Sequence, residues 1–212
     1  MRIAILTEMS TKAKNQFVVK ALEGRPGHEI HNLGMKDIEG EPELNYIDNG
    51  LLTALLLNSG AVDFIVSGCG TGQGYFNSAC MYPGVFCGMI LDPADAYIFP
   101  QINAGNCISL ALNKGFGWGG DVNLRMIFDE LLSVEFGGGY PPERKAPQEK
   151  FRNMLTQVSK DNHLDMPAIF DTMNQDVVKH CFTFPGVKEL MDQNADPKNP
   201  TTIAYYAKLK TL

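Results

Sequence analysis

The sequence predicts an α/β fold, a Rossmann-like three-layer sandwich with a five-stranded parallel sheet, followed by a helical C-terminal extension. Short apolar runs alternate with longer amphipathic stretches up to about residue 137. This alternation is typical of βαβ units with right-handed crossovers. No strand-like run recurs after that point, and a chain of 212 residues can bury one sizeable core and carry an appendage.

The first two βα units occupy the N-terminal part of the chain. Arg2–Leu6 is a short apolar strand, and Ser10 or Thr11 can cap the amphipathic helix that follows it. Residues 28–33 alternate in polarity and predict a second strand. Residues 45–59 carry leucines on one helix face, which we expect to pack against the sheet.

Three further strands complete the predicted sheet. They are expected at residues 62–67, 85–91 and 106–110. Helices are expected at residues 75–81 and 121–136. Between the last two strands, Asp92 is a helix N-cap and Pro93 the first helical residue, and Pro100 is expected to end or kink that helix.

Residues 145–212 differ from the part before them. Prolines divide them into short, weakly amphipathic helical pieces such as 148–159 and 168–180. We therefore predict an α/β domain at residues 1–144 and a helical extension at 145–212. Because the extension has so few apolar positions, we expect it to pack on the core or on a partner subunit.

A glycine-rich loop follows the third strand. Gly68, Gly70, Gly72 and Gly74 alternate with other residues around Cys69 and Thr71, so the loop can expose backbone N–H groups to an oxygen anion. It is not a P-loop, because no lysine follows its last glycine. It is not a dinucleotide fingerprint either, because it does not follow the first strand.

Cys69 is the candidate reactive residue. A thiol beside a helix N-terminus can lose its proton at a lowered pKa, and its thiolate is then a base or a nucleophile. The neighbouring amides could stabilise an oxyanion on the substrate. The alternative is that Cys69 is a small core residue in a tight turn. Glu8, at the carboxyl end of the first strand, is either a ligand-binding residue or a solvated loop carboxylate.

Composition excludes several classes of function. The formal charge of −6 gives no basic surface for nucleic acid, and no apolar run is long enough to cross a membrane. The N-terminus begins directly with a strand and lacks a signal peptide pattern. Five cysteines without C-x-x-C spacing predict reduced thiols in a cytoplasmic protein, with no disulfide and no metal site.

Together, these features resemble the ribose-5-phosphate isomerase B and galactose-6-phosphate isomerase family. The resemblance covers about residues 1–145 and rests on the strand order, the Cys69-Gly70-Thr71-Gly72 loop, and three further groups. These are Asn103, Asn106 and the run Phe136-Gly137-Gly138-Gly139 with Arg144 after it. The extension lies outside the resemblance.

The resemblance implies an aldose–ketose isomerase that forms a cis-enediolate without a cofactor. Cys69 would take the proton beside the carbonyl, Thr71 would help to shuttle protons, and the amides of Gly70, Gly72 and Gly74 would hold the enediolate oxygen. Asn103 would bind substrate hydroxyls. Arg144 would bind a phosphate, often across a subunit boundary, and we expect a homodimer or a dimer of dimers.

Several residues depart from the family pattern. Glu8-Met9 replaces an Asp-His pair, and Asn45-Tyr46-Ile47 replaces Asp-Tyr-Pro. Ile102 replaces the usual ring-opening histidine, and Tyr140 and Phe86 replace arginines. These changes favour a related isomerase with a substrate other than ribose 5-phosphate, such as a non-phosphorylated or modified sugar.

The competing hypothesis is a catalytically silent sugar-binding protein with the same fold. For an active enzyme, the extension could supply the lost groups from His163, Lys179, His180 or Lys188.

Overall fold

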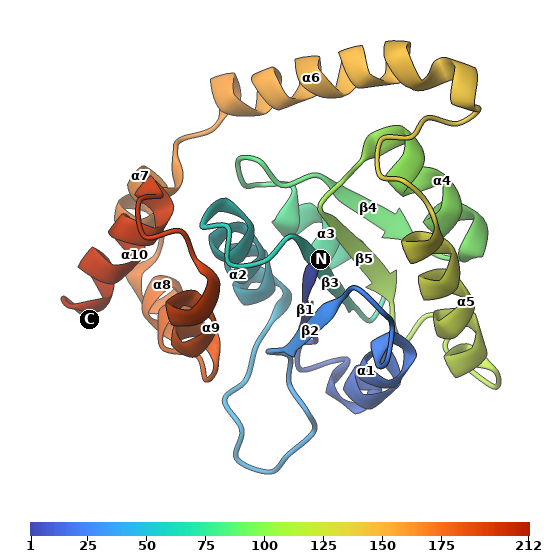
Figure 1. Ribbon diagram of the computed structural model, residues 1–212. Coiled ribbons are helices and arrows are strands. Elements are labelled where there is room, and N and C mark those ends of the chain that lie inside the picture. The colour runs from blue at the N-terminus through green and yellow to red at the C-terminus, as the bar shows by residue number, and fades with distance from the viewer.

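The computed structural model describes residues 1–212 and confirms the predicted α/β class (Figure 1). Five parallel strands form one sheet in the order β2-β1-β3-β5-β4. The strands are β1 Arg2–Leu6, β2 Glu29–Asn32, β3 Phe64–Cys69, β4 Cys87–Ile90 and β5 Cys107–Ala111. The strand β3 lies at the centre and is buried at every position, as its apolar, β-branched sequence predicts.

Helices cover both faces of the sheet. On the first face lie α1 (Asn15–Leu22), α4 (Pro93–Asn103) and α5 (Gly120–Ser133), whose apolar residues pack on Ile3, Val66 and Ile108. On the second face lie α2 (Tyr46–Asn58) and α3 (Gln73–Ala79), which pack on Leu6 and Ile65. Two short 3₁₀ helices, η1 (Lys12–Lys14) and η2 (Pro142–Arg144), precede α1 and the extension.

One helix continues past its proline. Pro100 is expected to end or kink its helix, and the first of these alternatives is wrong, because α4 runs to Asn103 with Pro100 in its last turn. A proline there gives up only one intrahelical hydrogen bond. The last turn is closed when the backbone N–H of Ala104 donates to the Pro100 carbonyl at 3.1 Å.

The extension is entirely helical. It consists of α6 Lys145–Asn162, α7 Met166–Thr172, α8 Gln175–Phe182, α9 Val187–Asn194 and α10 Pro200–Leu209. The expected single piece at 168–180 is two helices, because the Asn174 side chain accepts from the N–H groups of Asp176 and Val177 and starts a new one. No helix of the chain is both long and apolar enough to cross a membrane.

The extension shares the core of the second face. Figure 1 shows α6 stretched along one end of the molecule and α7–α10 gathered beside α2. Phe170, Phe182 and Tyr205 are fully buried and belong to the same apolar cluster as Leu51 and Leu55 of α2. The leucine face of α2 is therefore covered by the sheet on one side and by the extension on the other.

The contact between α2 and α3 depends on Gly50. A Cβ atom at this position would overlap the Ser78 Oγ atom of α3. We expect Gly50→Ala to lower the free energy of unfolding by ~1–3 kcal/mol, as overpacking of a core does. Chemical denaturation measures this change. Adding Ser78→Ala, which removes the Oγ atom, should recover part of the loss, and a Gly50→Ala variant as stable as the wild type would contradict the close packing.

Candidate active site

The carboxyl ends of β1, β3 and β5 bring three loops together around Cys69. Cys69 is the last residue of β3, between β1 and β5 in the sheet. Its carbonyl accepts from the N–H groups of Gly72 at 3.2 Å and Leu112 at 3.1 Å. The Gly70 carbonyl accepts from Asn113 at 3.0 Å and Lys114 at 2.8 Å. The glycine loop is thus fixed to the loop that follows β5.

The Cys69 thiol lies at the start of α3 beside an aromatic ring. Cys69 as a whole residue is 8 % exposed. A Cβ atom at Gly74 would lie 3.5 Å from Cys69 Sγ and 3.4 Å from Cγ of Tyr46. The thiol and the Tyr46 ring therefore flank the same point of the first turn of α3, and only a glycine leaves that point open.

Several backbone N–H groups around the thiol have no acceptor within the protein. Those of Gly70, Thr71 and Gly74 donate to no protein atom, whereas that of Gly72 donates to the Cys69 carbonyl. Of the three glycine amides expected to bind an enediolate oxygen, two are thus free to donate. Such amides at the start of a helix favour a negatively charged oxygen.

The Thr71 side chain lies at the exposed tip of the loop. Its Oγ1 atom accepts from the N–H group of Gln73 at 3.4 Å. This is a long hydrogen bond in which the Thr71 oxygen is the acceptor, so the hydroxyl proton remains free to donate to a substrate oxygen.

Glu8 is buried in its own loop. It is 3 % exposed, and its carboxylate accepts from the Ser10 N–H group at 3.0 Å, from the Ser10 hydroxyl, and from Thr11 Oγ1 at 3.4 Å. The Ser10 carbonyl in turn accepts from Asn113 Nδ2 at 2.8 Å. In this arrangement the carboxylate shapes the loop that faces Gly70 and does not extend into solvent.

Asn103 and Arg144 lie near the amino ends of the strands, at the end of the sheet opposite to Cys69. Asn103 is the last residue of α4 and lines a cavity of about 680 Å³ between α6 and the amino ends of β4 and β5. Arg144 is exposed at the end of η2, where α6 begins. One chain alone does not bring either residue to Cys69.

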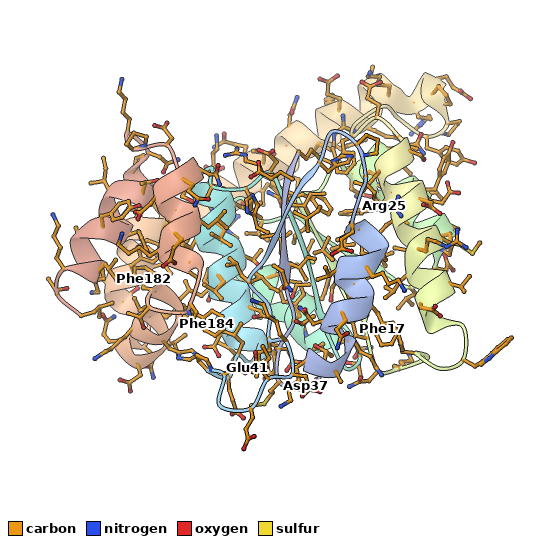
Figure 2. All side chains as sticks on the ribbon, turned by 60° about the horizontal axis from the view of Figure 1, so that its bottom comes forward. Phe17, Arg25, Asp37, Glu41, Phe182 and Phe184 are labelled. Atoms are coloured by element: carbon orange, nitrogen blue, oxygen red, sulfur yellow. The ribbon has the colours of Figure 1, made fainter.

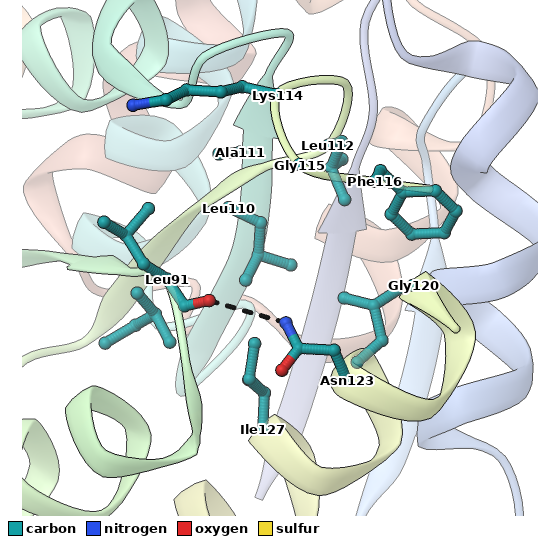
Figure 3. Close-up of a pocket in the computed structure, with 12 residues that line it drawn as sticks. Leu91, Leu110, Ala111, Leu112, Lys114, Gly115, Phe116, Gly120, Asn123 and Ile127 are labelled. Carbon is teal, nitrogen blue, oxygen red and sulfur yellow. Dashed lines mark hydrogen bonds between the residues drawn. The ribbon is translucent and has the colours of Figure 1, made fainter. Parts of the chain in front are cut away.

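A smaller pocket of about 240 Å³ lies beside the loop that follows β5 (Figure 3). Its walls are mostly apolar, and the Asn123 Nδ2 atom donates across it to the Leu91 carbonyl at 3.4 Å. Lys114 lies at its edge, and Figure 3 shows the lysine side chain extending away from the apolar walls. Cys69 lines neither of the two cavities.

Other cysteines are held as neutral thiols. A hydrogen bond with Cys107, together with burial, raises the pKa of the Cys87 thiol, and burial with the nearby Asp48 raises the pKa of Cys181. Burial also raises the pKa of Cys80. No three His, Cys, Asp or Glu side chains are grouped so as to hold a metal ion.

Sequence reasoning did not identify three residues near Cys69. The sequence marks Tyr46 only as part of a changed motif, and Asn113 and Lys114 lie between the predicted strand at 106–110 and the predicted helix at 121–136. The signal that could have found the last two is their position directly after β5, since ligands of parallel α/β sheets bind at the carboxyl ends of the strands.

Comparison with known proteins gives one family and a set of similar structures. A family model described as Ribose/Galactose Isomerase matches residues 3–146. None of the curated proteins matches the chain. A crystal structure of a 4-deoxy-L-threo-5-hexosulose-uronate ketol-isomerase complexed with a tartrate is 39 % identical, with a TM-score of 0.94 over 100 % of both chains.

Two ribose-5-phosphate isomerases are also similar. The one from Vibrio parahaemolyticus is 40 % identical, with a TM-score of 0.92 over 100 % of this chain and 98 % of its own. Ribose-5-phosphate isomerase B from Clostridium thermocellum is 22 % identical and covers 77 % of this chain and 100 % of its own, with a TM-score of 0.61. The third likeness concerns the fold alone, whereas the first two include the helical extension.

Proposed function

The chain belongs to the ribose/galactose isomerase family and is a sugar isomerase, and we propose that Cys69 is its general base in an aldose–ketose isomerisation. The observation that carries this proposal is the geometry of the β3–α3 loop. It presents a thiol beside the N–H groups of Gly70, Thr71 and Gly74, which have no acceptor in the protein. A base and an oxyanion site then lie on one turn.

The reaction follows from this arrangement. The Cys69 thiolate takes the proton from the carbon beside the carbonyl, and the electron pair of that C–H bond forms the double bond of a cis-enediolate. The carbonyl oxygen becomes an anion that the free amides stabilise. Thr71 passes a proton between the two oxygens, and the Cys69 thiol returns its proton to the neighbouring carbon. Hydrogen moves within one molecule, so the reaction balances without a redox cofactor.

The substrate proposed is an open-chain or ring-opened sugar that carries a carboxylate. Arginines of the family pattern are replaced by Phe86 and Tyr140, which reduces the positive charge available for a phosphate. The relative that matches over the whole of both chains is named for a uronate, and its structure holds a tartrate, a hydroxylated dicarboxylate. A sugar phosphate of the ribose-5-phosphate or galactose-6-phosphate type is the second candidate, because the Vibrio parahaemolyticus relative is named for ribose 5-phosphate.

Rates with three sugars test the substrate class. We expect kcat/KM for 4-deoxy-L-threo-5-hexosulose uronate to exceed that for ribose 5-phosphate and galactose 6-phosphate by about 10²-fold or more, the scale of discrimination that a mismatched polar group can produce. A preference for ribose 5-phosphate or galactose 6-phosphate would refute the assignment of a carboxylate substrate, and the assignment of the chain as an isomerase would be unaffected. Binding of a sugar without turnover of any would favour the catalytically silent sugar-binding protein.

A second copy of the chain is proposed to complete the site. Phe151, Met154, Leu155 and Val158 form one stripe on α6, and each is more than half exposed, at 63, 54, 53 and 51 %. Their spacing places them on one helix face. The stripe adjoins the cavity that Asn103 lines, and Arg144 lies at the start of the same helix. If a second chain packs on this face, Asn103 and Arg144 of the first chain can lie beside the Cys69 residue of the second chain.

Mixing two inactive variants tests the shared site. Cys69→Ala and Arg144→Ala should each be nearly inactive as pure dimers, whereas a mixed dimer keeps one intact site composed of residues from both chains. Random exchange of subunits in an equal mixture should therefore restore about a quarter of the wild-type activity. No recovery after subunit exchange, checked with differently tagged chains, would mean that Arg144 does not act across the interface.

A further inference from the structure

The segment from Glu43 to Asp48 forms one wall of the candidate site. It leads into α2 and is closed by a capping box, in which Asn45 and Asp48 each accept from the other's backbone N–H group. The Leu44 carbonyl accepts from the N–H group of Met9 at 2.8 Å, which fixes the loop that carries Glu8. The ring of Tyr46 lies against Gly74 beside the Cys69 thiol.

The far side of this segment is held by α8 of the extension. His180 Nε2 donates to the Glu43 carbonyl at 2.7 Å, so the proton of a neutral His180 lies on that nitrogen. The Cys181 thiol donates to the Asp48 carbonyl at 3.6 Å. These two contacts join neighbouring residues of α8 to the two ends of the segment.

Apolar packing supports the same contact. Phe182 and Phe184 are buried in the cluster that contains Leu44 of the segment and Met35 of the loop before it. Figure 2 shows Phe184 at the side of the extension next to α2 and the loop carrying Asp37 and Glu41, with Phe182 farther within the extension. Within the segment, Leu44 and Asp48 are buried, at 0 and 3 % exposed, whereas the Tyr46 and Ile47 side chains between them are 45 and 43 % exposed.

We propose that α8 is a positioning element of the active site, in which His180 and Cys181 hold residues 43–48 so that Tyr46 and the Glu8 loop face Cys69. His180 acts through a backbone carbonyl and not on the substrate, so it does not replace the histidines that the sequence lacks. The inference rests on the proposed function, since it assigns the extension a role at that site. It gives residues outside the family model's range of 3–146 a role in the chemistry.

Three variants test this role. His180→Ala removes the donor to Glu43, and His180→Gln keeps an N–H donor on a side chain of similar reach. Asp176→Ala is the matched control on the same helix, because the Asp176 side chain is exposed and makes no hydrogen bond or ion pair. We expect kcat/KM to fall about 10- to 100-fold in His180→Ala, as for a displaced site residue. It should stay within about threefold of the wild type in His180→Gln and Asp176→Ala.

Amide hydrogen exchange supplies a readout that needs no substrate. In His180→Ala, exchange should quicken at residues 8–10 and 43–48 and stay unchanged in β3 and β5, because only the held segment is released. Unchanged exchange at these residues would overturn the proposal, and so would faster exchange with unaltered kcat and KM. If no sugar is isomerised by the wild type, the proposed function fails. The rate of Cys69 alkylation in His180→Ala then replaces kcat/KM, and a rate equal to that of the wild type overturns the positioning role.

Discussion

Replacing Cys69 with serine is expected to lower kcat/KM by about 10³-fold, within the range that a positioned general base contributes. A serine hydroxyl is nearly isosteric with the thiol but is not deprotonated near neutral pH, so the variant keeps the site's shape and loses the base. Steady-state kinetics on the best sugar of the panel measures this loss. Circular dichroism and thermal unfolding should match the wild type.

Cys80→Ser is the matched control for this variant. Cys80 follows the last residue of α3, at the other end of the same helix, and is exposed as a residue although its thiol is partly covered. The kcat/KM of Cys80→Ser should stay within about twofold of the wild-type value, because a substitution at an exposed residue seldom changes the stability of the fold. Equal losses in Cys69→Ser and Cys80→Ser would show that the effect is not specific to the site, and full activity in Cys69→Ser would remove Cys69 from the mechanism.

Gly68→Ala should have the largest effect on stability. Gly68 pairs with Leu110 between β3 and β5, and a Cβ atom there would overlap the Leu110 carbonyl oxygen. Backbone cannot yield as a flexible side chain does, so we expect a loss of at least ~3 kcal/mol, at or above the usual cost of overpacking. For a chain of this size that is a fall in Tm of about 6–12 °C.

Gly117→Ala provides the comparison for Gly68→Ala. No atom lies within 4 Å of a Cβ built at Gly117, so its unfolding free energy should stay within about 0.5 kcal/mol of the wild type, as at most surface positions. Differential scanning calorimetry compares the two. If Gly68→Ala unfolds at the wild-type temperature, β3 and β5 are not as close as the structure has them.

Local sequence signals were sufficient to predict the sheet. Each strand combines apolar residues with flanking turn residues, and the predicted five strands are those observed. Helix ends were predicted less well where tertiary contacts decide them. Pro100 stays inside α4 because a proline in the last turn disturbs few hydrogen bonds, and Asn174 starts a helix within what reads as one continuous pattern.

The candidate site could be predicted only where its residues are close in sequence. Cys69, Gly70 and Thr71 lie in one loop, and its composition indicates their chemistry directly. Asn113 lies beside the Cys69 loop because of the order of the strands, and Tyr46 lies there because α2 packs on α3. Local composition reveals neither of these arrangements. The contact between His180 and Glu43 spans 137 positions, and no local pattern indicates it.

Solvent deuterium exchange tests the central claim most directly. Each sugar of the panel is incubated with the enzyme in heavy water, and deuterium at the carbon beside the carbonyl is followed by NMR, with the wild type and Cys69→Ala compared. We expect incorporation into one class of anionic sugar by the wild type and none above background by Cys69→Ala. Equal incorporation by both proteins would contradict Cys69 as the base. If the wild type forms the isomer without incorporating deuterium, either the proton transfer is shielded from solvent or hydride shifts directly without an enediolate. Activity of Cys69→Ala separates these two mechanisms, because only the shielded proton transfer requires the thiolate.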